Sequence, residues 1–273
     1  MRQPIFLVCL LAAVTSAPVA AAARDEPVAA AKAAIDAAVA DPRRTPANRQ
    51  RDRYRHPAET LAFFGVKPEM TVIEIWPGGG WYAEILAPML RSRGRYIAAA
   101  QASGRGRQAT EALFASDPAR FDKAVLTAFD PKVASQIAPP GSADMVLTFR
   151  NVHNFLMAGD AAAAQAFTDF HKALKPGGTL GVVDHRLPEN RAAEAERESG
   201  YLKRSTIIRL ATAAGFRLAG ESQVNANPKD SADWPKGVWT LPPVLSQGEQ
   251  DRAKYLAIGE SDRMTLKFVK PAA

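Results

Sequence analysis

The chain has 273 residues, of which 47% are hydrophobic and 23% are charged, as in an ordinary soluble globular protein with one sizeable α/β domain or two small ones. Its formal net charge is +7, but the basic residues do not form a long run interleaved with aromatic residues. This composition argues against nucleic-acid binding, so we expect a small-molecule partner.

The N-terminus has the pattern of a secretory signal peptide. Arg2 precedes an apolar run from Pro4 to Val14, and small residues continue to Ala23. The run is too short to span a membrane, so we expect a signal peptide over residues 1–23, cleavage near Ala23, no stable membrane insertion afterwards, and a periplasmic or secreted protein. The only cysteine, Cys9, lies inside this segment, which excludes disulfides and thiolate metal sites in the mature protein.

Residues 24–56 are predicted to form an N-terminal helix and a polar linker. The alanine-rich stretch 27–40 has helical spacing and ends at Asp41-Pro42, and the residues that follow are too polar for a core. Tyr54, Arg55 and His56 lie just before the main domain, which we place at residues 57–273, and they either belong to a solvated linker or contribute to a site.

The stretch from Thr71 to Leu86 predicts a buried strand, a glycine turn at Gly78, Gly79 and Gly80, and a helix. Such a turn lets a ligand approach bare backbone, and the helix start offers unpaired N–H groups to an anionic group. Read from Gly78, the pattern matches the alanine form of the dinucleotide fingerprint and suggests NAD. Read from Glu74, it has an acidic residue four positions before a Gly-x-Gly pair.

Further strands are predicted at 96–100, 124–128, 143–149, 179–184, 216–222 and 264–269. Ligands of open α/β sheets bind at the carboxyl ends of the strands. At these ends, the fourth strand is followed by Arg150, Asn151 and His153. The fifth strand leads into Asp184, which either contributes to a site or forms a surface ion pair. No two histidines have the i, i+4 spacing of a zinc pair, so we expect no metal site. The proline-rich stretch 225–243 carries Trp234 and Trp239, which either cover a pocket or fill a gap.

These motifs, in this order, resemble class I S-adenosylmethionine-dependent methyltransferases over about residues 57–270. A bacterial group of exported predicted methyltransferases is similar over the whole chain. The residues that carry the resemblance are Arg51-Asp52-x-Tyr54-Arg55-His56-Pro57, Pro77-Gly78-Gly79-Gly80-Trp81-Tyr82, Phe149-Arg150-Asn151-Val152-His153-Asn154, Leu174-Lys175-Pro176-Gly177-Gly178, Ala214-Gly215-Phe216 and Ala257-Ile258-Gly259-Glu260-Ser261-Asp262-Arg263. The resemblance implies a Rossmann-like fold, with a seven-stranded, mostly parallel sheet, an antiparallel last strand and helices on both faces.

The resemblance also implies roles for particular residues. Glu74 and the glycines Gly78, Gly79 and Gly80 would hold the methionine end of S-adenosylmethionine, and Phe149, Arg150 and Asn151 would line the site beneath the sulfonium. Gln101 replaces the usual ribose-binding acid, and Trp76 stands where the family has glycine. The catalytic candidates are His153, Asn151 and His56. His185 is a further possible base, and His153 is preferred because it follows the fourth strand.

Two alternatives to methyl transfer remain. Export places the protein where S-adenosylmethionine is scarce, and Trp76 and Gln101 both depart from the family at cofactor positions. These features favour a non-catalytic small-molecule-binding protein with the same fold. The alternative interpretation, an NAD-linked oxidoreductase, depends on the Gly78 pattern alone. The methyl acceptor is not specified by any motif.

Overall fold

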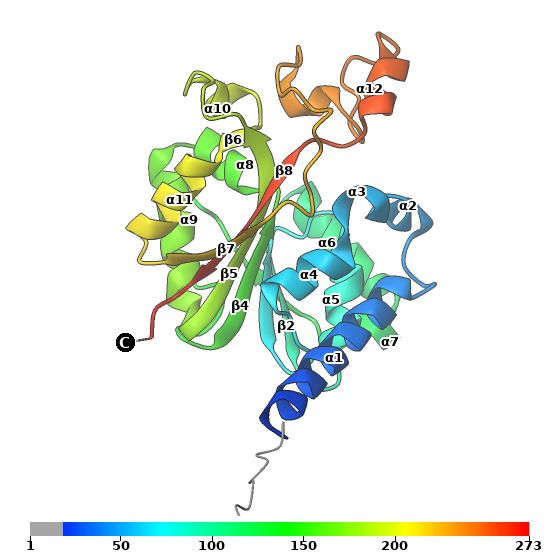
Figure 1. Cartoon of the computed structure of the whole chain (residues 1–273), viewed down its shortest axis with the longest axis vertical. Coiled ribbons are helices and arrows are strands. Elements are labelled where there is room, and N and C mark those ends of the chain that lie inside the picture. Colours follow the sequence, from blue (N-terminus) through cyan, green and yellow to red (C-terminus); the bar gives the residue numbers. More distant parts are fainter. Residues whose placement is uncertain (1–18, 273) are drawn as a thin grey trace, which may run out of the picture.

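A computed structural model describes residues 19–272 of the chain (Figure 1). Most of the predicted signal peptide, residues 1–18, lies outside this range. Helix α1 covers Val19–Ala40, so it begins earlier than predicted and ends where the sequence indicated. Among the described residues, no helix is long and apolar enough to cross a membrane.

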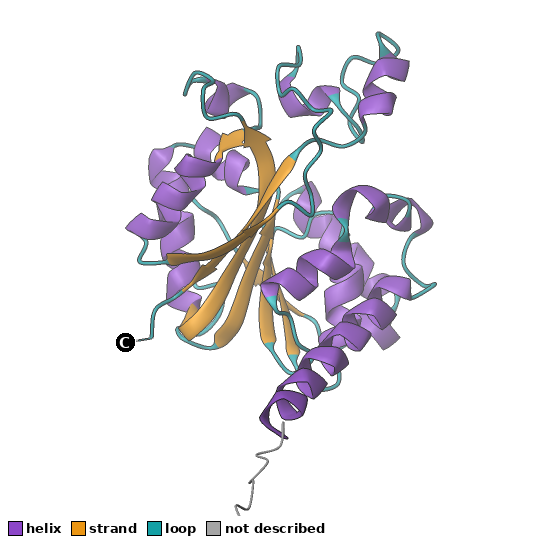
Figure 2. Ribbon diagram, viewed as in Figure 1, coloured by secondary structure: helices purple, strands orange, loops and turns teal. Residues whose placement is uncertain are grey.

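A single sheet forms the centre of the molecule (Figure 2). Its strands run in the order β3-β2-β1-β4-β5-β8-β7. The bounds are β1 Thr71–Ile75, β2 Arg95–Ala100, β3 Val125–Ala128, β4 Ala143–Phe149, β5 Leu174–Leu187, β7 Arg217–Ser222 and β8 Arg263–Val269. Strands β1 to β5 pair in parallel, and β8 is antiparallel to both of its neighbours, β5 and β7, as the resemblance implied.

The sheet differs from the prediction in two details. A two-residue strand, β6 (Leu202–Lys203), pairs with the end of β5 and makes an eighth strand. Strand β5 begins at Leu174 rather than at residue 179, because the Lys175–Gly178 turn is accommodated as a register shift between β4 and β5. Neither detail has a periodicity signal in the sequence, since a two-residue strand and an irregular turn are fixed by their neighbours.

Helices cover both faces of the sheet. One face carries α1, α4 (Pro57–Phe64), α5 (Ala83–Leu90), α6 (Arg105–Ser116) and α7 (Pro118–Phe121); the other carries α8 (Val152–Met157), α9 (Asp160–Ala173) and α11 (Arg204–Ala213). Alternate residues of β1 point to opposite faces of the sheet. Ile73 and Ile75 pack on the face with α8, α9 and α11, and Val72 packs on the face with α1, α4 and α5. Burial on both faces explains the continuous apolar strands of the sequence.

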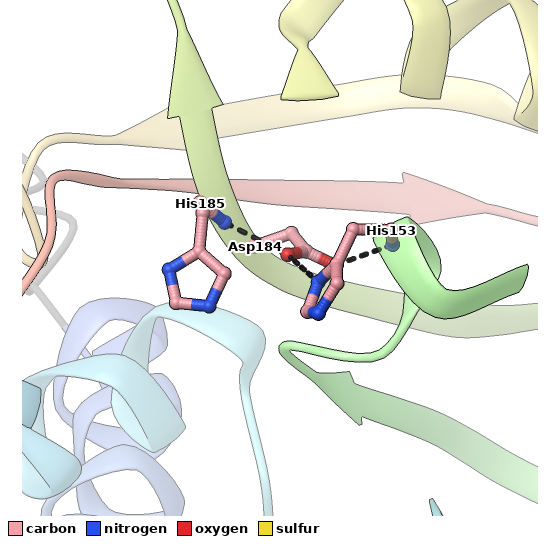
Figure 3. A group of neighbouring side chains, drawn as sticks. All are labelled: His153, Asp184 and His185. Carbon is pink, nitrogen blue, oxygen red and sulfur yellow. Dashed lines mark hydrogen bonds and ion pairs between the residues drawn. The ribbon is translucent and has the colours of Figure 1, made fainter. Parts of the chain in front are cut away.

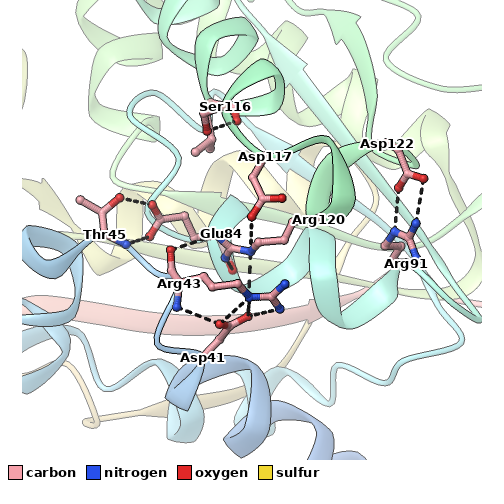
Figure 4. A network of polar contacts seen from close by, with 10 residues as sticks. Asp41, Arg43, Thr45, Glu84, Arg91, Ser116, Asp117, Arg120 and Asp122 are labelled. Atoms are coloured by element: carbon pink, nitrogen blue, oxygen red, sulfur yellow. Dashed lines mark hydrogen bonds and ion pairs between the residues drawn. The ribbon is translucent and has the colours of Figure 1, made fainter.

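Residues 41–56 pack on the domain instead of forming a solvated linker. They include α2 (Pro46–Arg49) and α3 (Asp52–Arg55). Arg44 is fully buried and forms a bidentate ion pair with Asp52, with N–O distances of 2.7 and 2.8 Å. Thr45 donates to the Glu84 carboxylate of α5, and Arg120 of α7 donates to the carbonyl oxygen of the same Glu84 (Figure 4). The polar sequence is compatible with packing on the domain because its two buried cations, Arg44 and Arg55, each pair with a carboxylate.

The segment between β7 and β8, residues 223–262, forms a cap beyond the end of β5, near β6 (Figure 1). It contains a short 3₁₀ turn at Gly237–Thr240 and α12 (Arg252–Ile258); the neighbouring α10 spans Ala195–Glu198. Asp230 fixes the cap by accepting hydrogen bonds from the Trp234 indole at 2.7 Å and from the backbone amide of Asp262 at 2.8 Å. This cap covers the edge of the sheet where the strand-end residues gather.

Candidate active site

A cavity of about 330 Å³ lies at the carboxyl ends of β1, β4 and β5, within the size range of small-molecule sites. Its wall combines strand-end residues, the N-terminal segment and the cap. The lining includes Asn48, Arg51, Arg55, Glu74, Trp76, Gly78, Gly79, Trp81, Tyr82, Phe149, Arg150, Asn151, His153, His185 and Trp239. The structure thus brings together most of the residues that the sequence predicted for a site.

The glycine turn forms one side of the cavity. Gly78 and Gly80 adopt positive φ angles of 58° and 78°, which explains the glycines. Among residues 19–272, no hydrogen-bond acceptor is found for the amides of Gly78 and Gly79, and a Cβ on Gly79 would have nothing within 4 Å. Gly80 instead packs under Leu113 of α6 and does not line the cavity, so its predicted contact with a cofactor is not supported.

Trp76 occupies the position where glycine was expected, with a φ of 45°. This conformation is uncommon for a bulky residue and signals local strain. The indole donates a hydrogen bond to the Phe129 carbonyl at 3.1 Å and packs edge-on against Phe155, with ring centroids 5.0 Å apart. Packing and hydrogen bonding compensate for the strain, and Trp76 still contributes to the cavity wall.

Glu74 is buried beneath the cavity and accepts a hydrogen bond from the Tyr96 hydroxyl at 2.6 Å. Burial raises the pKa of Glu74 to about 7, although the hydrogen bond from Tyr96 partly opposes the change. The carboxyl group is therefore protonated in a large fraction of molecules near neutral pH. A cationic group in the cavity would favour its ionised form.

Gln101, predicted to bind ribose, lies at the end of β2 but not in the cavity wall. Its side chain packs against Gly106, where an added Cβ would lie 2.4 Å from Oε1. That oxygen is buried and has no hydrogen-bond partner among the described residues. It is a free acceptor at the predicted position, but it is separate from the cavity.

The end of β4 supplies three predicted cofactor residues. Phe149 stacks on Tyr82, with ring centroids 3.6 Å apart. Arg150 has a left-handed backbone with a φ of 61°, which turns the chain away from the sheet. Asn151 donates to the Ile75 carbonyl at 2.8 Å, so it joins the ends of β4 and β1. This contact gives Asn151 a role in positioning the site wall.

His153 is held by Asp184 (Figure 3). The Nδ1 atom of His153 lies 2.8 Å from Asp184 Oδ1, and Asp184 also accepts hydrogen bonds from the backbone amides of Val152 at 2.8 Å and His185 at 2.8 Å. Because the carboxylate accepts, Nδ1 carries the hydrogen and Nε2 is left with a lone pair. Both residues are buried, and His153 lines the cavity. The arrangement is suited to accepting a proton from a bound molecule.

His185 completes the cluster and pairs with Ser261 through Nδ1 at 2.5 Å. Burial, together with the nearby His153 and Arg150, lowers the pKa of His185 well below the ordinary value, so it is neutral. Ligand atoms of His153, Asp184 and His185 lie within 4.8 Å of one another, a proximity that would also suit a metal ion. However, Asp184 already accepts hydrogen bonds at both oxygens, which favours a histidine–aspartate pair over a metal site.

The structure corrects one sequence expectation and decides between two readings that the sequence left open. His56 links α3 to α4 with a φ of 40° and does not line the cavity, so it does not belong with the catalytic candidates. Asp184 does not form a surface pair with Arg186, which binds Asp262 instead at 2.8 Å. Sequence reasoning missed the Asp184–His153 contact, although the pairing of β4 with β5 brings the two strand ends together and could have indicated it.

Comparison with solved structures identifies the fold. A methyltransferase from Aquifex aeolicus that depends on S-adenosylmethionine aligns with a TM-score of 0.55 and 15% identity, over 81% of this chain and 93% of that one. An O-methyltransferase family protein from Burkholderia thailandensis has a TM-score of 0.52 and 13% identity, over 83% and 57% of the two chains. The [4+2]-cyclase SpnF aligns with a TM-score of 0.55 and 14% identity, over 80% of this chain and 82% of that one. No family model matches the chain, and a search of curated proteins gives no match.

The molecule therefore has the Rossmann-like fold of class I methyltransferases. At these identities the likeness concerns the fold, and function has to be argued from the site. The unpaired amides of Gly78 and Gly79 and the carboxyl group of Glu74 fit the carboxylate and ammonium groups of a methionine moiety. At the ribose position the fit is incomplete, because Gln101 lies outside the cavity wall.

Proposed function

We propose that the protein transfers the methyl group of S-adenosylmethionine to a small-molecule acceptor, with His153 as the general base. The observation that carries the proposal is the Asp184-held His153 in the wall of the cavity that also contains Gly78 and Gly79. S-adenosylmethionine, when bound, supplies a methyl group on a positively charged sulfur. The protein then mainly has to bind and orient the acceptor and remove its proton.

Each part of the wall has a role in this proposal. Gly78, Gly79 and Glu74 bind the methionine moiety of the cofactor. His153 accepts the proton of the acceptor at Nε2, and Asp184 keeps the imidazole in the required tautomer and orientation. Trp239 of the cap lies 6.3 Å from His153 between ring centroids, in an edge-on arrangement, and helps to exclude water.

Calorimetric titration with S-adenosylmethionine and with NAD tests the first step. We expect micromolar binding of S-adenosylmethionine, about −8 kcal/mol, and no binding of NAD. His153→Gln should keep that binding, because the histidine acts on the acceptor, and should abolish turnover of any acceptor found. Lack of S-adenosylmethionine binding would contradict the proposal and favour a small-molecule-binding protein; binding of NAD would favour an oxidoreductase.

We also propose that the chain is exported and processed near Ala23, supported by the apolar run after Arg2. Expression with and without residues 2–23 tests this point. The full chain should be recovered from the periplasm with a shortened N-terminus, as measured by intact mass. Recovery of unprocessed protein from the cytoplasm alone would contradict export.

A further inference from the structure

Three arginines bind one carboxylate beside the cavity, and a fourth, Arg150, lies near them. Glu260 accepts from Arg51 Nε at 2.5 Å, from Arg55 Nε at 3.3 Å and from Arg263 Nη2 at 2.7 Å. Arg150 belongs to the same group, because it lines a small cavity together with Arg55 and Arg263. Two buried carboxylates, Glu260 and Asp184, act on this group, and they are too few to neutralise four guanidinium groups.

Three of these arginines, Arg51, Arg55 and Arg150, line the cavity, and we name them the arginine wall. Arg55 is 4% exposed, lies over the Trp81 ring at 4.7 Å and leaves its Nη2 atom buried without a hydrogen-bond partner. The Nη2 atom of Arg51 is likewise buried without a partner. In the part of the chain that the structure describes, no hydrogen bond or ion pair of the Arg150 guanidinium is found, and this residue is partly exposed.

The charge balance of the cavity favours an anion. Burial raises the pKa of Glu260, but Arg263, Arg55 and Arg51 outweigh that effect and lower it to about 2, so this carboxylate is already ionised. Desolvation and the charge of Arg263 lower the pKa of Arg150 to about 10, which leaves it cationic at neutral pH. Buried guanidinium groups with unused donors are stabilised by a bound anion through charge-assisted hydrogen bonds.

S-adenosylmethionine brings no net negative charge to the arginine wall. S-adenosylmethionine carries one carboxylate against an ammonium and a sulfonium group, so its binding makes the cavity more positive. Its carboxylate also has the free amides of Gly78 and Gly79 available. A second ligand with a net negative charge would balance the arginine wall.

We propose that the arginine wall binds a carboxylate or phosphate group of the methyl acceptor, so that the substrate is a small organic anion. This inference rests on the proposed methyl transfer. Planar guanidinium groups suit both oxyanions, because their paired N–H donors match two oxygens of one group. Binding there places the anionic end of the acceptor in the cavity that His153 also lines.

Titration of the full chain with inorganic phosphate and, separately, with S-adenosylhomocysteine tests the inference at constant ionic strength. Arg51→Gln and Arg150→Gln should each weaken phosphate binding by about tenfold or more, and Arg150→Lys should restore part of it. Arg53→Gln is the matched control for Arg51→Gln, because Arg53 is an exposed arginine of α3 only two residues after Arg51. Affinity for S-adenosylhomocysteine should stay within about twofold in all variants.

The two ligands separate the possible failures. If wild-type protein does not bind phosphate, or binds it equally well in Arg51→Gln and Arg150→Gln, the anion subsite is refuted. If these variants lose S-adenosylhomocysteine instead, the arginine wall serves the cofactor and the inference is also refuted. If wild-type protein binds phosphate with the expected variant pattern but never binds S-adenosylhomocysteine, the proposed methyl transfer fails while the anion subsite stands.

Discussion

Replacing Glu74 with glutamine should stabilise the protein at alkaline pH. Glu74 is 3% exposed and has a pKa of about 7, against an ordinary value of 4.5. This difference means that ionising the buried carboxyl group costs the folded state about 3 kcal/mol, at 1.36 kcal/mol per pKa unit. Glutamine resembles the protonated acid and can still accept the Tyr96 hydroxyl hydrogen bond.

The sign of the pH dependence follows from the raised pKa. The wild-type protein has the full benefit of a neutral Glu74 below pH 4.5, and it loses that benefit as the pH rises from 4.5 to about 7. The stability advantage of Glu74→Gln should therefore be less than about 1 kcal/mol at pH 5 and about 3 kcal/mol at pH 8.5. Urea denaturation at both pH values measures it.

The matched control is Glu59→Gln, which makes the same chemical change at an exposed position of α4. It should change stability by less than about 0.5 kcal/mol at either pH. An advantage of Glu74→Gln that is equal at pH 5 and pH 8.5, or a loss of stability at pH 8.5, would refute the reasoning about burial. Glu74→Gln should also bind S-adenosylmethionine about tenfold more weakly at pH 8, because the ammonium group of the ligand loses a carboxylate partner.

Asp184→Asn should lower turnover by a factor of about 10² or more, because the amide no longer holds His153 in one tautomer. The variant should also alter the pH profile of the residual activity. An unaltered pH profile would assign Asp184 a structural role only. Gly80→Ala should lower the free energy of unfolding by about 1–3 kcal/mol, because the φ of Gly80 is 78° and the new methyl group meets Leu113. Gly79→Ala should change the free energy of unfolding by less than about 0.5 kcal/mol but should weaken S-adenosylmethionine binding. Equal thermal shifts for the two variants would contradict this geometry. Glu260→Gln should destabilise the protein by about 3 kcal/mol at pH 7. This destabilisation should disappear as the pH falls through about 2, because Glu260 stabilises the folded state only while it is ionised. Chemical denaturation at pH 7 and pH 3 measures how far the destabilisation decreases.

The fold was largely predictable from local patterns. The β-branched run at Val72, Ile73 and Ile75 and the glycines after it predicted β1 and its turn. The order of strand and helix patterns resembled a known topology, which implied the mostly parallel sheet and the antiparallel last strand. Strand β6 was missed, because a two-residue strand exists only through its pairing with β5.

The candidate site was predicted in part. Residues that directly follow β1 and β4 were found, because the carboxyl ends of parallel strands meet at one edge of a sheet. His56 and Gln101 were placed by sequence position and by family analogy, and neither lies in the cavity wall. At both positions, backbone direction and helix packing determine where the side chain goes, and neither is encoded in a short motif.

The sequence by itself determined the elements, their order and the glycine turn, because these depend on residues close together in the chain. Only the tertiary structure decided which polar groups meet. Asp184 reaches His153 across 31 positions, and Arg51 and Arg55 reach Glu260 across 209 and 205 positions. Such contacts arise from the closure of the sheet and its cap, so no local pattern of residues specifies them. They give the cavity a histidine held by a carboxylate and a group of arginines.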